Sequence, residues 1–195
     1  VKAADAVTVR PVARADAAAI AAIYDPFVRE SVVTFEEEPV DAATMADRIG
    51  TVTASFPWWV LCLDDDVVGY AYATTWRARS AFRFVCETSI YLDARVRGRG
   101  LASGLYRALF DDLRVRGIEV AMAAIALPNP ASVALHERLG FVSVGLMPAV
   151  GWKLGRWVDL GFWQYRLRPR VNAAGQEAAG QEAAGQEAAE QGSGG

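Results

Sequence analysis

The residues best suited to chemistry lie in three short segments of the chain. The first is Arg97-Gly98-Arg99-Gly100-Leu101-Ala102, where small residues let the backbone approach a ligand closely. If a helix begins here, its free amide groups and its dipole favour a phosphate group, and nearby arginines, including Arg95, add positive charge. A pyrophosphate is therefore the ligand that this segment favours. An ordinary glycine-containing turn with solvated arginines would have the same local sequence.

The sequence pattern of this segment excludes two common phosphate-binding loops. A P-loop requires Gly-x-x-x-x-Gly-Lys followed by Ser or Thr, and the segment contains no Lys. A dinucleotide-binding turn requires Gly at the end of Gly-x-Gly-x-x-Gly, where this chain has Ser103. The glycine-rich segment is thus predicted to serve a phosphate site of another kind.

The second segment runs from Leu127 to Phe141 and contains Asn129, Ser132 and His136. These residues recur at intervals of three and four, so on a helix they would share one face, which could hold a ligand. His136 could donate a proton to a leaving group there. The alternative is that this histidine is a surface or helix-capping residue.

The third segment is centred on Glu87, which lies in the apolar run 84–92. Burial raises the pKa of a carboxyl group, and a raised pKa suits a general base. A carboxylate on the solvent face of a strand, or one paired with an arginine, is the alternative. The neighbouring Cys86 is expected to be a buried, inert thiol rather than the nucleophile of an acyl-enzyme.

The spacing of apolar residues predicts an α/β fold with helices and strands in alternation. We expect helices that begin at Asp16, after Asp41, at Gly100 and at Asn129, with the third ending at Arg116 and the fourth at Gly140. Interleaved strands call for a mixed sheet of about seven strands with helices on both faces. The expected strands are 7–11, 58–63, 67–76, 84–92, 120–127, 142–147 and 158–167.

One domain, 7–168, accounts for these elements, and the composition changes abruptly after it. The unit Ala-Ala-Gly-Gln-Glu recurs three times from residue 173 onward, and this part offers no large apolar residue for a core. We therefore expect 169–195 to be a disordered, low-complexity tail.

Charge and composition limit the partners of the chain. The net charge is −3, and because residues 173–195 contain four Glu and no Lys or Arg, the domain is nearly neutral. A nearly neutral domain is not expected to bind nucleic acid. Two Cys, one His and the lack of a long apolar run predict a soluble cytoplasmic protein with no metal site and no membrane span.

Taken together, these segments resemble the acetyltransferases of the GNAT superfamily. The resemblance rests on Arg-x-x-Gly-x-Ala at 97–102 and on Asn-x-x-Ser-x-x-Leu at 129–135, which is followed by Gly140-Phe141. The sequences Glu-Thr-Ser-Ile-Tyr-Leu at 87–92 and Lys-Leu-Gly-Arg-Trp-Val-Asp at 153–159 are similar to the phosphinothricin acetyltransferase branch. The resemblance covers nearly all of residues 7–167.

The resemblance implies a GNAT-like fold and acetyl transfer from acetyl-CoA to the amine of a small molecule. Backbone amides of Ile90 and Leu92 would pair with the pantetheine arm, residues 97–102 would hold the pyrophosphate, and Asn129 and Ser132 would contact the coenzyme. Glu87 would accept the proton of the amine, and His136 would donate a proton to the sulfur.

The same resemblance implies a substrate pocket and a homodimer. The pocket residues would be Phe35, Arg77, Arg79, Phe82 and Tyr91, with the arginines suited to acidic oxygens of an amino acid analogue such as phosphinothricin or methionine sulfone or sulfoximine. Relatives commonly have Tyr where this chain has Phe82, so the chain lacks one hydroxyl group of that pocket. Two alternatives remain open: a peptide or protein N-terminal acetyltransferase, and a non-catalytic acetyl-CoA sensor.

Overall fold

The computed structural model describes residues 6–169. The predicted tail, apart from residue 169, lies outside the described residues. Within the described range the chain forms seven strands, four α-helices and three short 3-10 turns. The strands are β1 Val7–Pro11, β2 Trp58–Leu63, β3 Asp66–Thr75, β4 Val85–Leu92, β5 Val120–Leu127, β6 Val142–Lys153 and β7 Arg156–Arg166. The helices are α1 Ala17–Glu30, α2 Ala42–Thr53, α3 Ala102–Val115 and α4 Pro130–Arg138, and the turns are η1 Arg14–Asp16, η2 Ser80–Phe82 and η3 Ala94–Val96.

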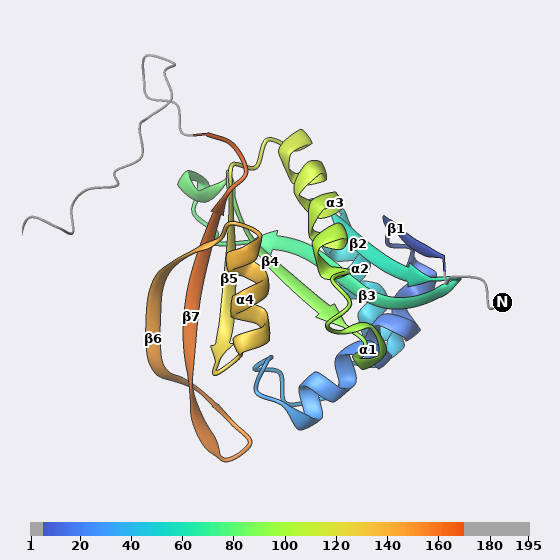
Figure 1. Cartoon of the computed structure of the whole chain (residues 1–195), viewed down its shortest axis with the longest axis horizontal. Helices are drawn as coiled ribbons and strands as arrows, with labels where there is room; N and C mark the ends of the chain where they lie inside the picture. Colours follow the sequence, from blue (N-terminus) through green and yellow to red (C-terminus); the bar gives the residue numbers. More distant parts are fainter. Residues whose placement is uncertain (1–5, 170–195) are drawn as a thin grey trace, which may run out of the picture.

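The strands form one mixed sheet in the order β1-β2-β3-β4-β5-β7-β6. Neighbouring strands are antiparallel except β4 and β5, which are parallel because the chain crosses over through α3 between them. Strand β6 lies at one outer edge of the sheet, and its hairpin end reaches past the other strands (Figure 1). The predicted seven-stranded mixed sheet is confirmed.

Helices cover both faces of the sheet, as the sequence predicts. On one face, Leu105, Leu109 and Leu113 of α3 are fully buried against β3, where Ala71 and Ala73 leave room for the helix. Helix α4 packs on the same face, and α1 and α2 cover the opposite face. Each face has its own apolar core, so the sheet is held rigidly between them.

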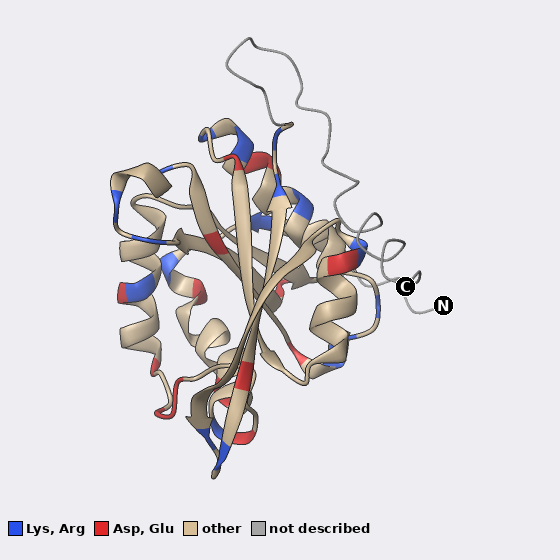
Figure 2. Ribbon diagram, turned by 90° about the vertical axis from the view of Figure 1, so that its left-hand side faces the viewer, with Lys and Arg blue, Asp and Glu red and all other residues tan. Residues whose placement is uncertain are grey.

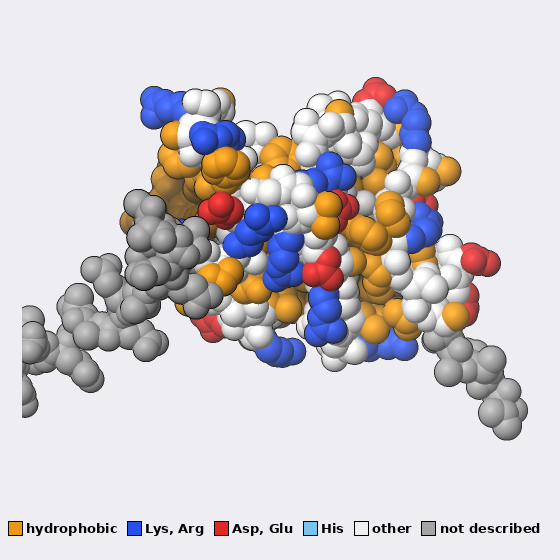
Figure 3. Space-filling model, turned by 90° about the horizontal axis from the view of Figure 1, so that it is seen from above, with side chains coloured by type: hydrophobic (Ala, Val, Ile, Leu, Met, Phe, Trp, Pro, Cys, Tyr) orange, Lys and Arg blue, Asp and Glu red, His pale blue; other side chains and the backbone are white. Residues whose placement is uncertain are grey.

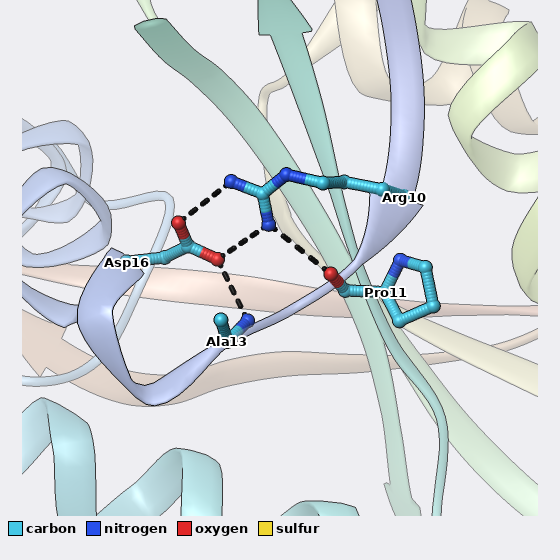
Figure 4. Close-up of polar contacts among 4 residues, drawn as sticks. All are labelled: Arg10, Pro11, Ala13 and Asp16. Atoms are coloured by element: carbon cyan, nitrogen blue, oxygen red, sulfur yellow. Dashed lines mark hydrogen bonds and ion pairs between the residues drawn. The ribbon is translucent and has the colours of Figure 1, made fainter. Parts of the chain in front are cut away.

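Two of the predicted helix starts are confirmed, and a third differs. Asp41 accepts a hydrogen bond from the Thr44 amide at 2.7 Å and caps α2, while Asn129 caps α4 in the same way. Asp16 does not cap α1, because its own backbone is already helical and its side chain faces back along the chain. Its carboxylate accepts two hydrogen bonds of 2.8 Å from Arg10 and one of 2.7 Å from the Ala13 amide (Figure 4).

Two element boundaries also differ from the predicted ones. Helix α3 begins at Ala102 rather than Gly100, because Gly100 has a φ of 78°, which a right-handed helix does not allow. Strand β6 continues past Met147 to Lys153. Its register shifts between Met147 and Gly151, where Ala149 has a φ of 48°, and pairing with β7 then resumes.

Replacing Asp16 with Ala is expected to destabilise the fold by about 1–3 kcal/mol at pH 7, because the change removes charge-assisted hydrogen bonds at a largely buried carboxylate. The Arg10 guanidinium holds the pKa of Asp16 below its usual value. The contribution is therefore present above the unfolded pKa of about 4 and is lost as the pH falls through the folded pKa. Chemical denaturation of both proteins across this pH range measures it.

Asp47→Ala is the matched control, because it breaks an exposed pair with Arg14 that is expected to contribute less than about 1 kcal/mol. Equal effects of the two substitutions, or a difference for Asp16→Ala that does not shrink in acid, would contradict this account.

Candidate active site

The centre of the sheet opens where β4 and β5 separate. In the described structure their ladder consists of three register pairs and ends at Glu87 and Met122, although both strands continue for five more residues. Beyond that point the facing backbone edges are free of each other. A cavity of about 50 Å³ lies there, lined by residues of both strands, among them Ser89, Ile90 and Ala124, and by His136. The site is thus an opening in the sheet itself.

A larger cavity of about 470 Å³ lies beside this opening, on the α3 and α4 side. Gly98 and Gly100 line it with φ values of 74° and 78°, and a Cβ atom on either would meet nothing within 4 Å. The glycines therefore serve the left-handed turn and leave backbone amides at the start of α3 open to a ligand. The predicted coenzyme residues that line this cavity are Ile90, Leu92, Arg97, Gly98, Gly100, Leu101, Ala102, Asn129 and Ser132.

The arginines of this region differ in their positions. Arg97 donates from Nε to the Leu92 carbonyl at 3.0 Å, and its guanidinium lies 4.7 Å from the centre of the Phe27 ring. Arg95 and Arg99 are not among the cavity-lining residues, and Arg95 forms an ion pair of 3.0 Å with Asp93. Arg138, at the end of α4, does line the cavity, and sequence reasoning missed it. Its helical spacing from Leu135 and Ala131 could have indicated it.

His136 is held as a neutral ring inside the protein. Its exposure is only 3%, and burial lowers its pKa. Nδ1 lies 2.8 Å from the Ser132 carbonyl oxygen, which can only accept, so Nδ1 carries the hydrogen. Nε2 lies 2.8 Å from the Tyr106 hydroxyl and therefore accepts a hydrogen bond from it. Both ring nitrogens are engaged, so this arrangement offers no free N–H for the predicted proton donation to sulfur.

Glu87 lies on the opposite face of the sheet from the coenzyme-side cavity. Residues alternate along β4, so Cys86 and Thr88 are buried toward α3 while Glu87, Ser89 and Tyr91 face α1 and α2. Burial raises the pKa of the Glu87 carboxyl, and the charge of Arg77 partly offsets the rise. Burial also raises the pKa of the Cys86 thiol to about 12, in agreement with an inert thiol.

Of the five predicted substrate residues, Arg77 lies near Glu87 and Tyr91 lines the small cavity between the strands. Arg77 is close enough to act on the Glu87 charge and stacks at 4.8 Å on the Trp76 ring. Tyr91 packs edge-on against Tyr24 and Phe27 and lines the small cavity between the strands. The remaining three residues are exposed; they are Phe35, Arg79 and Phe82.

A buried lysine forms hydrogen bonds with the segment that contains Phe35. Lys153 is 2% exposed and donates from Nζ to the Thr34 carbonyl at 2.8 Å and to the Phe27 carbonyl, at the end of α1, at 3.3 Å. The Thr34 hydroxyl also forms a hydrogen bond of 2.6 Å with Tyr24. Helix α1, the segment after it and the hairpin of β6 and β7 are thereby joined.

Among residues 6–169 no group of three or more His, Cys, Asp or Glu side chains is placed to hold a metal ion. No helix in that range is long and apolar enough to cross a membrane. Acidic and basic residues are interspersed along the ribbon (Figure 2), and apolar side chains lie among basic and acidic ones on the face seen from above (Figure 3).

The chain is similar to known proteins in sequence and in fold. The model of the acetyltransferase (GNAT) family matches residues 20–141. A phosphinothricin N-acetyltransferase of Streptomyces viridochromogenes is 37% identical over 81% of this chain and 86% of its own. An L-methionine sulfoximine/L-methionine sulfone acetyltransferase of Pseudomonas aeruginosa is 39% identical over 85% of this chain and 98% of its own. The crystal structure of a phosphinothricin acetyltransferase of Sinorhizobium meliloti in complex with acetyl-CoA is 39% identical, with a TM-score of 0.80 over 89% of this chain and 94% of that one.

Proposed function

The chain belongs to the acetyltransferase (GNAT) family, and from that premise we propose that it transfers an acetyl group from acetyl-CoA to the primary amine of an amino acid analogue. Phosphinothricin and methionine sulfone or sulfoximine, named in its relatives, are the acceptors we propose. The observation that carries the proposal is the position of Glu87. Glu87 is the last residue of β4 that pairs with β5, and it directly precedes Thr88 and Ser89, which line the opening between the strands.

The proposed coenzyme position follows from the two adjoining cavities. Pyrophosphate would meet the amides of residues 98–102, with Arg97 and Arg138 supplying positive charge. The pantetheine arm would extend along the free edge of β4, where Ile90 and Leu92 offer backbone groups that β5 no longer occupies. The thioester would then reach the small cavity between β4 and β5.

The amine would approach from the face that α1 and α2 cover. Only the free base of an amine attacks a thioester, so a proton must first leave the ammonium group, and Glu87 accepts it. The amine nitrogen then forms a bond to the carbonyl carbon and becomes positively charged. When the carbon–sulfur bond breaks, coenzyme A leaves as a thiolate, the nitrogen loses its second proton to give the neutral amide, and the thiolate takes up a proton to give the free thiol. His136 and Tyr106 would orient this region as a hydrogen-bonded pair, since neither nitrogen of the ring is free.

We further propose a cytoplasmic homodimer. The two cysteines are free and buried, which suits a reducing compartment. Strand β6 is a twelve-residue edge strand with exposed apolar side chains, including Leu146, Trp152 and the neighbouring Trp157 of β7 at 57%, 54% and 62% exposure. A long apolar edge of this kind is normally covered, and a second copy of the chain is the occupant that the family resemblance favours.

If the protein is a dimer, analytical ultracentrifugation should give a molecular mass twice the 21.0 kDa of one chain. Leu146→Glu should shift the protein toward the monomer, because a charge on this edge would be buried without a partner. Val115→Glu, at an exposed site on α3, should leave the mass unchanged. A parent protein that sediments as a monomer would contradict the dimer.

The coenzyme position predicts that acetyl-CoA raises the melting temperature of the protein, since a ligand selective for the folded state stabilises it. Gly100→Val should abolish this shift by blocking the amides of the turn. Gly117→Val is the control: Gly117 has a φ of 79° at the end of α3, so the variant carries similar backbone strain outside the cavity. If Gly100→Val keeps the parental shift, the turn does not hold the coenzyme.

The function itself is tested by thiol release from acetyl-CoA with a panel of amino acid analogues and peptides. With the best amine, Glu87→Gln should lower kcat/KM by about 10²–10⁴ near pH 7 and recover partly toward about pH 9.5, as more amine arrives deprotonated. The parent should lose activity as acid protonates Glu87, whose pKa is raised. Parental activity of a folded Glu87→Gln protein at pH 7 would refute the proposed base.

A further inference from the structure

The segment between α1 and α2, residues 31–41, lies at the opening of the sheet although it forms neither helix nor strand. Val32 is buried in a small apolar cluster with Ala126 of β5 and Val158 of β7. The next residue, Val33, lines both the small cavity between β4 and β5 and the larger coenzyme-side cavity. The segment therefore forms part of the wall that the coenzyme would contact.

Three polar contacts of side chains hold this segment to the rest of the domain. The Thr34 hydroxyl forms a hydrogen bond of 2.6 Å with Tyr24 of α1, and Glu36 accepts two of 2.6 and 3.0 Å from Arg48 of α2. The third contact is the hydrogen bond of 2.8 Å from Lys153 Nζ to the Thr34 carbonyl. Of these three, the Lys153 contact is the one that comes from the β6–β7 hairpin rather than from a flanking helix.

The second hydrogen bond of Lys153 reaches another part of the same wall. Its Nζ donates to the Phe27 carbonyl at 3.3 Å, and the Phe27 side chain lines the coenzyme-side cavity. The guanidinium of Arg97 lies 4.7 Å from the centre of the Phe27 ring. A single ammonium group thus bridges the carbonyl of Phe27 and that of Thr34, the residue next to Val33 in the chain.

The ammonium group is buried without a directly bound counter-ion. Lys153 is 2% exposed, and it forms no ion pair with a carboxylate of residues 6–169. Burial lowers its pKa, and the charges of Glu37 and Glu36 partly offset this effect. A buried cation is costly unless its donors are satisfied, and here carbonyl oxygens satisfy them. Within the same residues no backbone amide donates to the Thr34 carbonyl, so the two groups depend on each other.

We propose that Lys153 is a positioning residue for the coenzyme, because its hydrogen bonds to the Phe27 and Thr34 carbonyls fix Phe27 and Val33 in the wall of the coenzyme-side cavity. The inference rests on the proposed function, which assigns that cavity to acetyl-CoA. Without the ammonium group, a smaller fraction of the molecules would hold this wall in its binding position. The apparent Kd of acetyl-CoA rises in proportion as that fraction falls.

The test is Lys153→Met, which keeps the length of the side chain and removes its charge and its donors. The variant should raise the Kd of acetyl-CoA, measured by isothermal titration calorimetry, by about tenfold. Amide hydrogen exchange of residues 31–36 should become faster. The KM for acetyl-CoA should rise more than kcat falls, because Lys153 acts on the wall and does not touch the reacting atoms.

Asp16→Ala is the matched control, because it also removes a largely buried charge but acts at the opposite end of α1 from Phe27. It should lower the melting temperature and leave the Kd of acetyl-CoA within about twofold of the parental value, since its contacts lie outside the cavity. Both variants are compared with the parent well below their melting temperatures.

The outcomes separate this inference from the proposed function. Absence of thiol release by the parent with every amine would refute the proposed function, whereas the Kd of acetyl-CoA tests Lys153 by itself. A parental Kd in Lys153→Met would overturn the positioning role, and so would an equal rise in Asp16→Ala, which would reflect lost stability alone. Lys153→Gln, uncharged and one atom shorter, repeats the comparison, so that a methionine variant that fails to fold does not decide the result.

Discussion

The structure depends on the place where the pairing of β4 with β5 ends. If β4 and β5 were paired along their whole length, the sheet would have no opening, and no ligand could contact both of its faces at this point. Because the ladder ends at Glu87 and Met122, the backbone edge of β4 that faces β5 is free from that point onward, and we propose that the coenzyme and the amine meet at this opening from opposite faces of the sheet. The cores formed with α1, α2 and α3 hold the two strands apart while the rest of the sheet stays continuous.

Features governed by local backbone chemistry could be predicted from the sequence. Asp41 and Asn129 cap helices because their short side chains reach the amides of the first turn. The apolar run 84–92 likewise indicated a strand that carries Glu87, with a buried carboxyl group and an exposed or arginine-paired one as the two alternatives. Each of these needs only a few neighbouring residues to specify it.

Features that depend on contacts between distant residues could not be predicted in this way. Tyr106 lies in the apolar stripe of α3 and is typical of a core residue, yet its hydroxyl meets His136, thirty residues away. Lys153 resembles a surface lysine in sequence, but the hairpin carries it to carbonyl groups at the end of α1. Asp16 was expected to cap a helix because nothing near it shows that Arg10 would bind its carboxylate more strongly.

We propose that burial at the end of the β4–β5 ladder makes Glu87 a base. The direct measurement is an NMR titration of the Glu87 side-chain carboxyl carbon in the folded protein, with Glu87→Gln used to assign its signal. The midpoint should lie above that of an ordinary glutamate, because burial outweighs the nearby charge of Arg77. A midpoint at or below the ordinary value would show a carboxylate stabilised as an ion pair, and would contradict the account.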